Sequence, residues 1–595
     1  MVIRSRIKSS AYFDSVALML VQREVRALPG VREAGAVMGT EANKELLRDA
    51  GLLSSEAEAA RADDLILAVD AVDSGMADDA LVRAEELLTR RREPAGTPQG
   101  YRPKTVASAA RMLSGANLAL ISVPGRFAAG VAAEALDAGL HVMLFSDNVP
   151  LEAEVALKRR AAAAGRLVMG PDCGTAIIGG AALGFANRIR RGTIGVVGAA
   201  GTGIQEVTSL IHRGGAGISQ AVGTGGRDLR REVGGLTALA GLDALGVDPL
   251  TEAIVFISKP PSAEVASRLL AAARRTGKPV VVNFIGAAVE SGERLFPART
   301  LEDTAELAVQ VTSGSPPQWP RRDALPGQEA LRLAPGQRYV RGLYSGGTLC
   351  YEALMLLEPF VGPIHSNTPL DRAQMLPSAH RSIAHTVIDL GSDEFTVGRL
   401  HPMLDPDLRL QRLLREAEDP EVAVILLDVV LGYGAHANPA GALAPVIRQA
   451  RNRSRDAGRW LSVVASVCGT DEDPQGYDDQ VAQLIEAGAL VQSSNAQAAR
   501  LAGLIAQGAG AGAGEVAKAH SPEPIRTATG PAEPVPAVSA EIIRLMAGPV
   551  KVVNVGLGLF EESLHAQGVD VISVDWQPPA GGKQYLIDIL DRLGA

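Results

Sequence analysis

Short apolar segments alternate with alanine-rich segments from Asn117 onward, and this alternation limits the possible folds more than any other feature. Strand, helix and strand at this spacing predict βαβ units, in which helices cover both faces of parallel sheets. We therefore expect a multidomain α/β protein. The expected strands are Leu118–Val123, Val142–Phe145, Leu167–Met169, Ile194–Val197, Ile254–Ile257, Val280–Phe284, Val340–Tyr344, Thr386–Leu390, Val422–Val430 and Leu461–Val467.

Two stretches rich in Gly, Ala and Pro divide the chain, whose 595 residues correspond to about four units at roughly 150 residues per domain. These stretches, Thr312–Arg338 and Gln507–Ala537, have little to bury and predict flexible or extended spacers. The residues up to Glu93 carry a helical apolar pattern and two short strand candidates, which predict a small α+β module. Val538–Ala595 predicts a βαβ-like fragment that packs on another domain or another chain.

Composition excludes several classes of protein. Apolar residues make up 47% of the chain and charged residues 21%, which is enough to fill several cores, so disorder throughout is excluded. The net charge of −9 comes without a long basic run, so we expect neither nucleic acid nor an anionic membrane as a partner. Small molecules and other proteins are the expected partners.

The cysteines and the N-terminus indicate the compartment. Cys173, Cys350 and Cys468 lie far apart without a CxxC pair, which excludes a disulfide framework and a thiolate zinc site, so we expect no metal. The N-terminal segment reaches Asp14 and Arg23 before an apolar core of signal-peptide length can build, and later apolar runs stop short of the roughly 18 residues that span a bilayer. We expect a soluble, cytoplasmic protein.

The first candidate site is a Gly-rich turn between a strand and a helix, GVVGAAGTGIQEV. Gly201, Thr202 and Gly203 stand where the helix begins, and Glu206 follows within it. Glycine lets the backbone approach an anion, and the free N–H groups and the dipole of a helix N-terminus favour phosphate. The turn therefore predicts a phosphate cradle.

A second turn, YVRGLYSGGTLCYEAL, repeats this design with Gly346, Gly347, Thr348 and Glu352. Neither turn ends in Lys followed by Ser or Thr, so a Walker A nucleotide site is disfavoured. Each turn alone is also compatible with an ordinary tight strand–helix connection.

Two further turns follow expected strands. Gly225, Gly226 and Arg227 in AVGTGGRDL would either meet an anion or simply form a turn. Asp172 and Cys173 in MGPDCGTAIIGG stand where ligands of parallel sheets often bind, although a lone cysteine is more often a small buried residue than a nucleophile.

Histidines supply the remaining candidates. His436 and Asn438 lie in LLDVVLGYGAHANPAG, at the carboxyl end of a strongly apolar strand, where a binding role and a structural role are both open. His365, His380 and His385 have no metal-ligand spacing, so we interpret them as surface or structural residues.

Together these motifs resemble the succinyl-CoA synthetase superfamily of acyl-CoA synthetases. Asn117–Ile178 is similar to the Rossmann-like CoA-binding domain of its α subunit, in which a strand–Pro-Gly-aromatic turn matches Pro124 and Gly125. The stretch GPDCG, with Asp172 and Cys173, stands in place of the superfamily's Gly-Pro-Asn-Cys-Pro-Gly loop. The resemblance implies these four residues as contacts of a CoA-like ligand.

The Gly-rich turns resemble the ligase domains of the same superfamily. The first matches its Ser-Gly-Thr-x-x-x-Glu phosphate-binding helix, and Gly225–Gly226 match its Gly-x-Gly-Gly turn. Asp389–Gly441 is similar to the carboxyl domain of the β subunit, so the chain resembles an α subunit fused to that domain. After Phe284–Ala287 the superfamily presents a phosphorylated histidine that is missing from this sequence, and no ATP-grasp domain is recognisable.

Over nearly its whole length the chain resembles the FdrA family, also called AllF, from YFDSVALMLVQREV to NVGLGLFEESLHAQGVDVISVDW. The resemblance implies a subunit of an oxamate carbamoyltransferase in allantoin and purine breakdown, which works with AllG- and AllH-type partners in a homo- or hetero-oligomer. Phosphorolysis of oxalurate to oxamate and carbamoyl phosphate needs an inorganic phosphate site but no nucleotide or other cofactor.

The resemblance also gives the expected domains. They are a small α+β module at 1–100, a Rossmann-like CoA-binding-type domain at 101–190, flavodoxin-like, succinyl-CoA synthetase-like ligase domains at 191–315 and 339–506, linkers at 316–338 and 507–537, and a βαβ-like segment at 538–595.

We hypothesise that phosphate, or the phosphoryl end of carbamoyl phosphate, binds at one or both Gly-Thr turns. His436 would then bond phosphate or act as the acid for the leaving amide nitrogen, and Glu206 and Glu352 would orient that histidine or a loop. Two alternatives stay open: an acyl-CoA ligase that binds CoA and takes its phosphohistidine or ATP-grasp from another chain, and a non-catalytic scaffold subunit.

Overall fold

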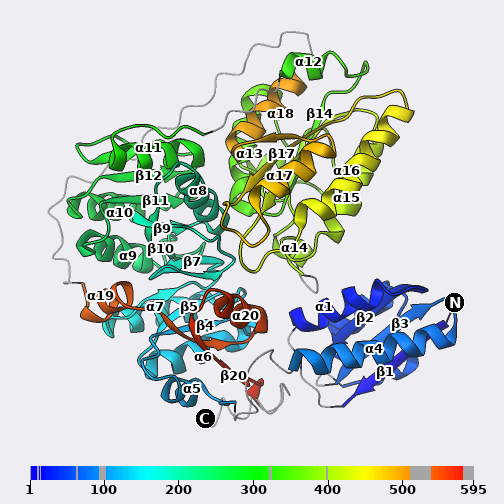
Figure 1. Cartoon of the computed structure of the whole chain (residues 1–595), viewed down its shortest axis with the longest axis horizontal. Helices are drawn as coiled ribbons and strands as arrows, with labels where there is room; N and C mark the ends of the chain where they lie inside the picture. Colours follow the sequence, from blue (N-terminus) through cyan, green and yellow to red (C-terminus); the bar gives the residue numbers. More distant parts are fainter. Residues whose placement is uncertain are drawn as a thin grey trace.

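The computed structural model describes residues 2–9, 13, 15–61, 64–92, 102–319, 325–396, 400–509 and 538–579. In this part of the chain the strands form four sheets, one of three strands, one of seven and two of five. Figure 1 shows the three larger sheets with their helices and the N-terminal module beside them. The expected α/β fold is confirmed. Among the described residues, no helix combines the length and the apolar character that crossing a membrane requires.

The N-terminal module is an antiparallel sheet in the order β1-β3-β2. Its elements are β1 (Val2–Lys8), α1 (Ser15–Arg26), β2 (Val31–Met38), α2 (Glu41–Asp49), α3 (Ser55–Glu58), β3 (Leu65–Ala71) and α4 (Ser74–Arg92). Leu65, Leu67 and Val69 alternate along the central strand and pack against α1 and α4 in one core. The module meets the rest of the chain through Arg23, whose guanidinium donates to the carbonyl of Leu404 at 3.3 Å.

The Rossmann-like sheet is built from two distant parts of the chain. Its elements are α5 (Val106–Met112), β4 (Leu118–Ile121), α6 (Gly125–Asp137), β5 (His141–Leu144), α7 (Leu151–Ala163), β6 (Val168–Met169), α19 (Ala540–Ala547), β19 (Lys551–Val555), α20 (Gly558–Ala566) and β20 (Asp570–Val574). The order is β20-β19-β4-β5-β6, and β19 runs parallel to β4. Figure 1 shows red α20 beside cyan β4 and β5. The C-terminal fragment therefore packs on a domain of its own chain.

The central sheet has the order β13-β12-β11-β9-β10-β7-β8. Its elements are β7 (Thr175–Ile178), β8 (Ala181–Gly184), β9 (Arg191–Ala199), α8 (Gly201–Arg213), β10 (Ile218–Gly223), α9 (Leu236–Val247), β11 (Ala253–Ser258), α10 (Ala263–Arg275), β12 (Val280–Phe284), β13 (Leu295–Pro297) and α11 (Leu301–Ser313). The hairpin β7–β8 lies within 101–190, the range expected for the Rossmann-like domain. It nevertheless joins the central sheet, because β7 pairs antiparallel with β10.

The third large sheet has the order β15-β14-β16-β17-β18, all parallel. Its elements are α12 (Pro326–Ala330), β14 (Tyr339–Tyr344), α13 (Gly347–Val361), η1 (Arg372–Gln374), β15 (Thr386–Asp389), α14 (Asp393–Thr396), α15 (Asp407–Glu418), β16 (Val422–Val430), α16 (Pro439–Asp456), β17 (Ser462–Cys468), α17 (Tyr477–Glu486), β18 (Leu490–Gln492) and α18 (Asn495–Ala509). The expected linker 316–338 contains α12. Of the expected linker 507–537, residues 507–509 end α18 and the rest lies outside the described residues.

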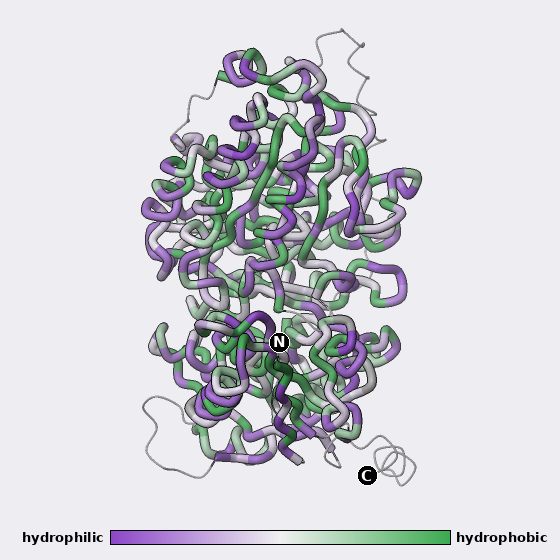
Figure 2. Tube along the Cα trace, turned by 90° about the vertical axis from the view of Figure 1, so that its right-hand side faces the viewer, coloured by the Kyte–Doolittle hydropathy of each residue, from purple (hydrophilic) through white to green (hydrophobic). Residues whose placement is uncertain are grey.

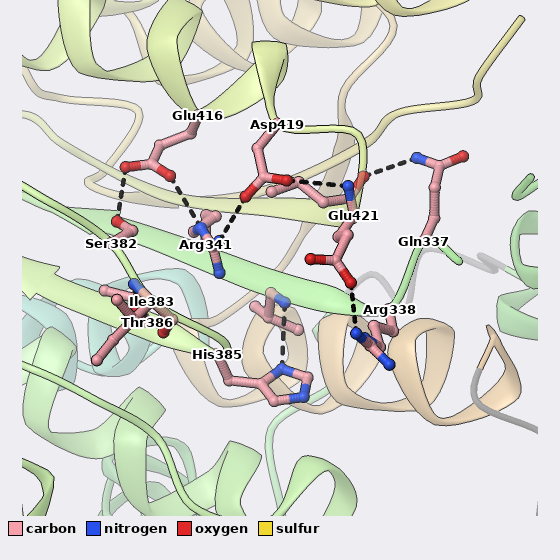
Figure 3. A network of polar contacts seen from close by, with 12 residues as sticks. Gln337, Arg338, Arg341, Ser382, Ile383, His385, Thr386, Glu416, Asp419 and Glu421 are labelled. Carbon is pink, nitrogen blue, oxygen red and sulfur yellow. Dashed lines mark hydrogen bonds and ion pairs between the residues drawn. The ribbon is translucent and has the colours of Figure 1, made fainter. Parts of the chain in front are cut away.

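A polar network closes the amino end of β14. Arg341, which is 2% exposed, donates to Glu416 at 2.9 Å and to Asp419 at 2.8 Å, as Figure 3 shows. The imidazole of His385 accepts from the N–H of Val340, and burial lowers its pKa to about 4, so it is neutral. This network fixes one end of the strand. The Gly-Thr turn follows the opposite end.

The central and third sheets share one hydrophobic core. Helices α8, α11, α13 and α18 from the two sheets contribute apolar side chains to the same buried cluster. Figure 2 shows the hydrophobic strands as green tubes inside the molecule, with purple segments toward the outside. Because a common core of this kind resists sliding, it holds the N-termini of α8 and α13 in a fixed relation.

Candidate phosphate site between two helix N-termini

The two predicted Gly-Thr turns meet across the interface of the central and third sheets. The N–H of Thr348 donates to the hydroxyl oxygen of Thr202 at 3.2 Å, and both side chains are buried. A side-chain carbon at Gly346 would lie 2.9 Å from Thr202, and one at Gly203 would lie 3.0 Å from Thr348. Glycine at both positions therefore allows the two helix N-termini to come into direct contact.

The N-terminus of α8 has unpaired backbone donors. The N–H groups of Gly201, Thr202 and Gly203 make no hydrogen bond within the described part of the chain, and the first such bond of the helix runs from Ile204 to Ala200. Thr202 and Gly203 are buried. No side chain caps this helix. The arrangement is the one that binds anions at helix N-termini.

The N-terminus of α13 differs in having two carboxyl groups of the protein beside it. The buried carboxylate of Asp428 accepts from the N–H groups of Ser345 and Gly346, each at 2.8 Å, and pairs with Arg409. Asp389 lies beside the first residue of the helix, because a side-chain carbon at Gly347 would be 2.7 Å from its Oδ2. Two carboxyl groups of the chain thus lie at this N-terminus and make it less favourable for a further anion. Of its first three helical N–H groups, that of Thr348 is bonded to Thr202, while those of Gly347 and Leu349 have no partner in the described chain.

Glu206 and Glu352 bind the opposite halves of the interface together. Glu206 of α8 accepts from the N–H of Asn495, which begins α18, and Glu352 of α13 accepts from the N–H of Leu301, which begins α11. The side chain of Asn495 also donates to Glu352 at 2.8 Å. Burial raises the pKa of both glutamates, to about 7 for Glu352. Both residues thus cap helices and fasten the interface.

Three polar residues at this place were missed by the sequence analysis. Asp389 ends β15, Asp428 lies near the end of β16, and Lys259 directly follows β11. The charge of Lys259 lowers the pKa of Asp389, and its ammonium lies 5.1 Å from the ring centre of Tyr351 on α13. The signal was available, because each residue stands at the carboxyl end of an expected strand, the position that drew attention to His436.

The loop 171–175 lies against two turns of the central sheet, the one that begins α8 at Gly201 and the one at Gly225 and Gly226. A side-chain carbon at Gly225 would be 2.1 Å from the carbonyl oxygen of Pro171, and Gly225 has a φ of +81°, so only glycine suits this position. Gly226 lies beside Asp172, at 3.5 Å by the same measure. Burial raises the pKa of the Cys173 thiol to about 12, which makes it an inert core residue.

His436 and Asn438 lie elsewhere. Asn438 is the N-cap of α16 and accepts from the N–H of Gly441. The N–H of His436 donates to the carbonyl of Met403 at 2.7 Å. Burial lowers the pKa of its imidazole, and the charge of Arg23 in the N-terminal module lowers it further. None of the contacts of these two residues within the described chain is with α8 or α13.

Pro124 and Gly125 begin α6 at the carboxyl edge of the Rossmann-like sheet. A side-chain carbon at Gly125 would lie 2.1 Å from the carbonyl oxygen of Asp147, so the chain's own backbone fills the space that glycine leaves. Asp147 and Asp172 repel one another, which helps to raise the pKa of Asp172 to about 6 after the larger effect of burial. Glycine is therefore required for this close approach of two backbone segments, and contact of these residues with a CoA-like ligand stays a prediction.

Three family models match the chain. A CoA-binding domain model matches residues 190–286, and a CoA-ligase model matches residues 343–505. The first match falls on the central sheet, where we expected a ligase domain. The AllF heavy metal-associated domain model matches residues 1–103. The fold and these domains define a protein of the CoA-ligase-like α/β class.

Similar proteins narrow the class to a family. The chain is 43% identical over 501 residues to the uncharacterized protein YahF of Escherichia coli (strain K12). This match covers 83% of the present chain and 97% of YahF. Together with the AllF model, this relationship shows that the chain belongs to the FdrA/AllF family.

More distant similarities concern parts of the chain. The alpha subunit of succinate–CoA ligase (ADP-forming) from Aquifex aeolicus (strain VF5) is 32% identical over 188 residues, which cover 31% of this chain and 60% of that subunit. The dinucleotide-forming acetyl-coenzyme A synthetase 1 of Ca. Korarchaeum cryptofilum has 20% sequence identity and a TM-score of 0.26, and the match covers 68% of this chain and 85% of that one.

The N-terminal module does not fit the heavy metal after which its matching domain family is named. Residues 1–103 contain neither cysteine nor histidine, whereas soft metal ions favour thiolate and imidazole ligands. Within the described chain, no group of three or more His, Cys, Asp or Glu residues is arranged to hold a metal ion. We therefore assign no metal-binding role to this module.

Proposed function

We propose that this chain is the phosphate-binding subunit of an oxamate carbamoyltransferase, which converts oxalurate and phosphate into oxamate and carbamoyl phosphate. The three unpaired N–H groups of Gly201, Thr202 and Gly203 support this proposal most strongly. Buried backbone donors are nearly always paired in folded proteins. Three unpaired N–H groups, two of them on the buried residues Thr202 and Gly203, stand at the start of a helix of 13 residues and fit the oxygens of a phosphate.

The reaction has the chemistry that such a site can serve. An oxygen of hydrogenphosphate attacks the ureido carbonyl carbon of oxalurate, a C–O bond forms, and the C–N bond to the oxamate nitrogen breaks. One proton passes from hydrogenphosphate to that nitrogen, so atoms and charge balance. The N–H groups at α8 hold the phosphate in place for attack, which converts a bimolecular step into one between positioned groups.

The reaction also agrees with what the sequence lacks. No histidine stands between Phe284 and Leu301, where the succinyl-CoA synthetase superfamily presents its phosphohistidine. Phosphorolysis needs neither that residue nor a nucleotide. We further propose that activity requires AllG- and AllH-type partner subunits, in a cytoplasmic complex.

The first experiment measures carbamoyl phosphate formed from oxalurate and phosphate, by the chain alone and by the chain with its AllG- and AllH-type partners. We expect product only from the mixture. If the fully assembled complex yields none, the proposed reaction is wrong.

A pair of substitutions at Gly201 tests the phosphate site. Gly201 is the first residue of α8, a position that proline tolerates well, so Gly201→Pro deletes one N–H while keeping the helix. Gly201→Ala is the matched control, because a side-chain carbon there would lie 3.6 Å from Thr175, at ordinary contact distance, and the N–H remains. Phosphate affinity, measured by calorimetry and as the phosphate KM, should fall about 10- to 100-fold in the proline variant alone, as one charged hydrogen bond is lost.

Two results would favour the other candidates. Full activity of the Gly201→Pro complex would indicate a scaffold whose partner holds the site. The domain matches over residues 190–286 and 343–505 favour an acyl-CoA ligase as the second candidate. Submillimolar CoA binding in calorimetry, without phosphorolysis of oxalurate, would support that alternative.

A further inference from the structure

The contact between α8 and α13 brings a carboxyl group close to the unpaired N–H groups of α8. Thr202 of α8 touches Gly346, and Asp389 touches Gly347. Asp389 is 8% exposed at the end of β15. A group held at α8 therefore lies close to an acid that belongs to the neighbouring sheet.

The two oxygens of Asp389 differ in their surroundings. Oδ1 accepts from the N–H of Gly391 at 2.9 Å. Oδ2 receives no hydrogen bond within the described chain, yet it is not among the polar atoms that the fold seals from solvent. The backbone around Asp389 is fixed on both sides by the amide of Asn367. One oxygen is thus anchored while the other is available to a ligand.

Resting on the function proposed above, we infer that Asp389 is the proton relay of the carbamoyl transfer. Its carboxylate takes the proton of the attacking hydrogenphosphate, and its carboxyl group returns that proton to the nitrogen of the departing oxamate. No proton is gained or lost in the cycle. An amide anion is a poor leaving group, so a positioned acid has the most to contribute at this atom.

The charged groups around Asp389 suit a relay. Burial has the largest effect and raises its pKa to about 6, Lys259 opposes that rise, and Asp428 and Asp393 add to it. The buried thiol of Cys350 also lies within electrostatic reach. A bound phosphate would raise the pKa further, because two anions at adjoining helix N-termini repel unless one of them is protonated.

The neighbouring imidazole cannot take this role. His401 lies against the same loop, since its Nε2 would be 2.7 Å from a side-chain carbon at Gly391. Burial lowers its pKa to about 4, and its Nδ1 accepts from the N–H of Met403. The ring is therefore neutral at pH 7 with its proton on Nε2, and a neutral imidazole is a very weak acid.

The test is the pH dependence of oxalurate phosphorolysis by the assembled complex carrying Asp389→Asn. The amide cannot carry the proton, so kcat should fall about 100-fold or more while the phosphate KM stays the same or decreases. In the wild type, kcat should fall at high pH, where the shared proton is lost, and this limb should disappear in the variant. Asp389→Glu, which keeps a carboxyl group, should retain the limb.

Asp393→Asn is the matched control, because it removes an exposed carboxylate that also raises the pKa of Asp389. It should keep near wild-type kcat, with a small shift of the limb to lower pH. The relay is refuted if Asp389→Asn keeps more than about a third of kcat and an unchanged profile, or if Asp389→Glu loses the limb. A wild-type complex without any phosphorolysis would instead refute the proposed function itself.

Discussion

The N-termini of α8 and α13 carry the same sequence pattern, Gly-Thr followed by Glu, but they differ in what occupies them. At α8 the N–H groups of Gly201–Gly203 have no partner in the described chain. At α13 the carboxylate of Asp428 takes the N–H of Gly346, and Asp389 lies against Gly347. Similar turns thus leave three unpaired N–H groups at the start of α8 and place two carboxyl groups at the start of α13.

This difference agrees with the two tasks of the reaction proposed above, anion binding and proton transfer. Carboxyl groups at the N-terminus of α13 repel phosphate, so in the reaction proposed above the N-terminus of α8 binds the anion and Asp389 of β15 supplies the acid. The direct contact of Thr202 with Thr348 joins the two tasks at one place. Two copies of an open site would bind anions but would hold no proton donor.

The largest expected effect is on stability and follows from removing the Asp428 carboxylate from the N-terminus of α13. Asp428→Ala removes the acceptor of two N–H groups and leaves Arg409, which is 4% exposed, without its partner carboxylate. We expect the free energy of unfolding to fall by about 3–5 kcal/mol, as for other buried ion pairs that lose one partner. Urea unfolding followed by circular dichroism measures the loss.

Asp419→Ala is the control for that substitution. It removes the same charge from the same domain, at the C-cap of α15 beside the amino end of β14. There Asp419 is half-buried, and Arg341 keeps Glu416 as a partner (Figure 3). The control should cost about 1 kcal/mol or less, as at partly exposed ion pairs. Equal losses in the two variants would show that Asp428 has no special role at the helix.

A smaller effect is expected at the contact between the helices. Thr202→Val replaces the hydroxyl by a methyl group of similar size and leaves the N–H of Thr348 buried without an acceptor. We expect a loss of about 1–3 kcal/mol in the free energy of unfolding. Thr202→Ser keeps the hydroxyl and should lose less. If the valine variant is as stable as the serine variant, this hydrogen bond does not hold the N-termini together.

The sequence predicted the Gly-Thr turns at the starts of α8 and α13 but not the difference in what lies beside each turn. The alternation of strands and helices and the Gly-Thr-Glu pattern are local features of the sequence. They predict the starts of α8 and α13, which contain Thr202 and Thr348. The carboxyl groups at the start of α13 come from other strands, Asp389 from β15 and Asp428 from β16, and strand order is not visible in a single sequence. The same holds for the Rossmann-like sheet, in which β19 joins β4 across most of the chain. His436 stood out by its position after a strand, whereas the structure places it beside Arg23.

The last prediction is a pH dependence, and it concerns Glu352 of α13 and Glu206 of α8. Burial raises the pKa of Glu352 from 4.5 to about 7, so between these pH values the folded protein binds a proton that the unfolded chain does not. This proton stabilises the fold at low pH, and its contribution is lost as the pH rises through about 7. Glu352→Gln cannot titrate and should lack this dependence, apart from a constant offset from its altered hydrogen bonds to Leu301 and Asn495. The unfolding free energy of the wild type minus that of the variant should therefore decrease from pH 5 to pH 8. A difference that rises over this range would contradict the raised pKa of Glu352.

Glu206→Gln on α8 should show a difference that also decreases with pH, since burial raises the pKa of Glu206 as well.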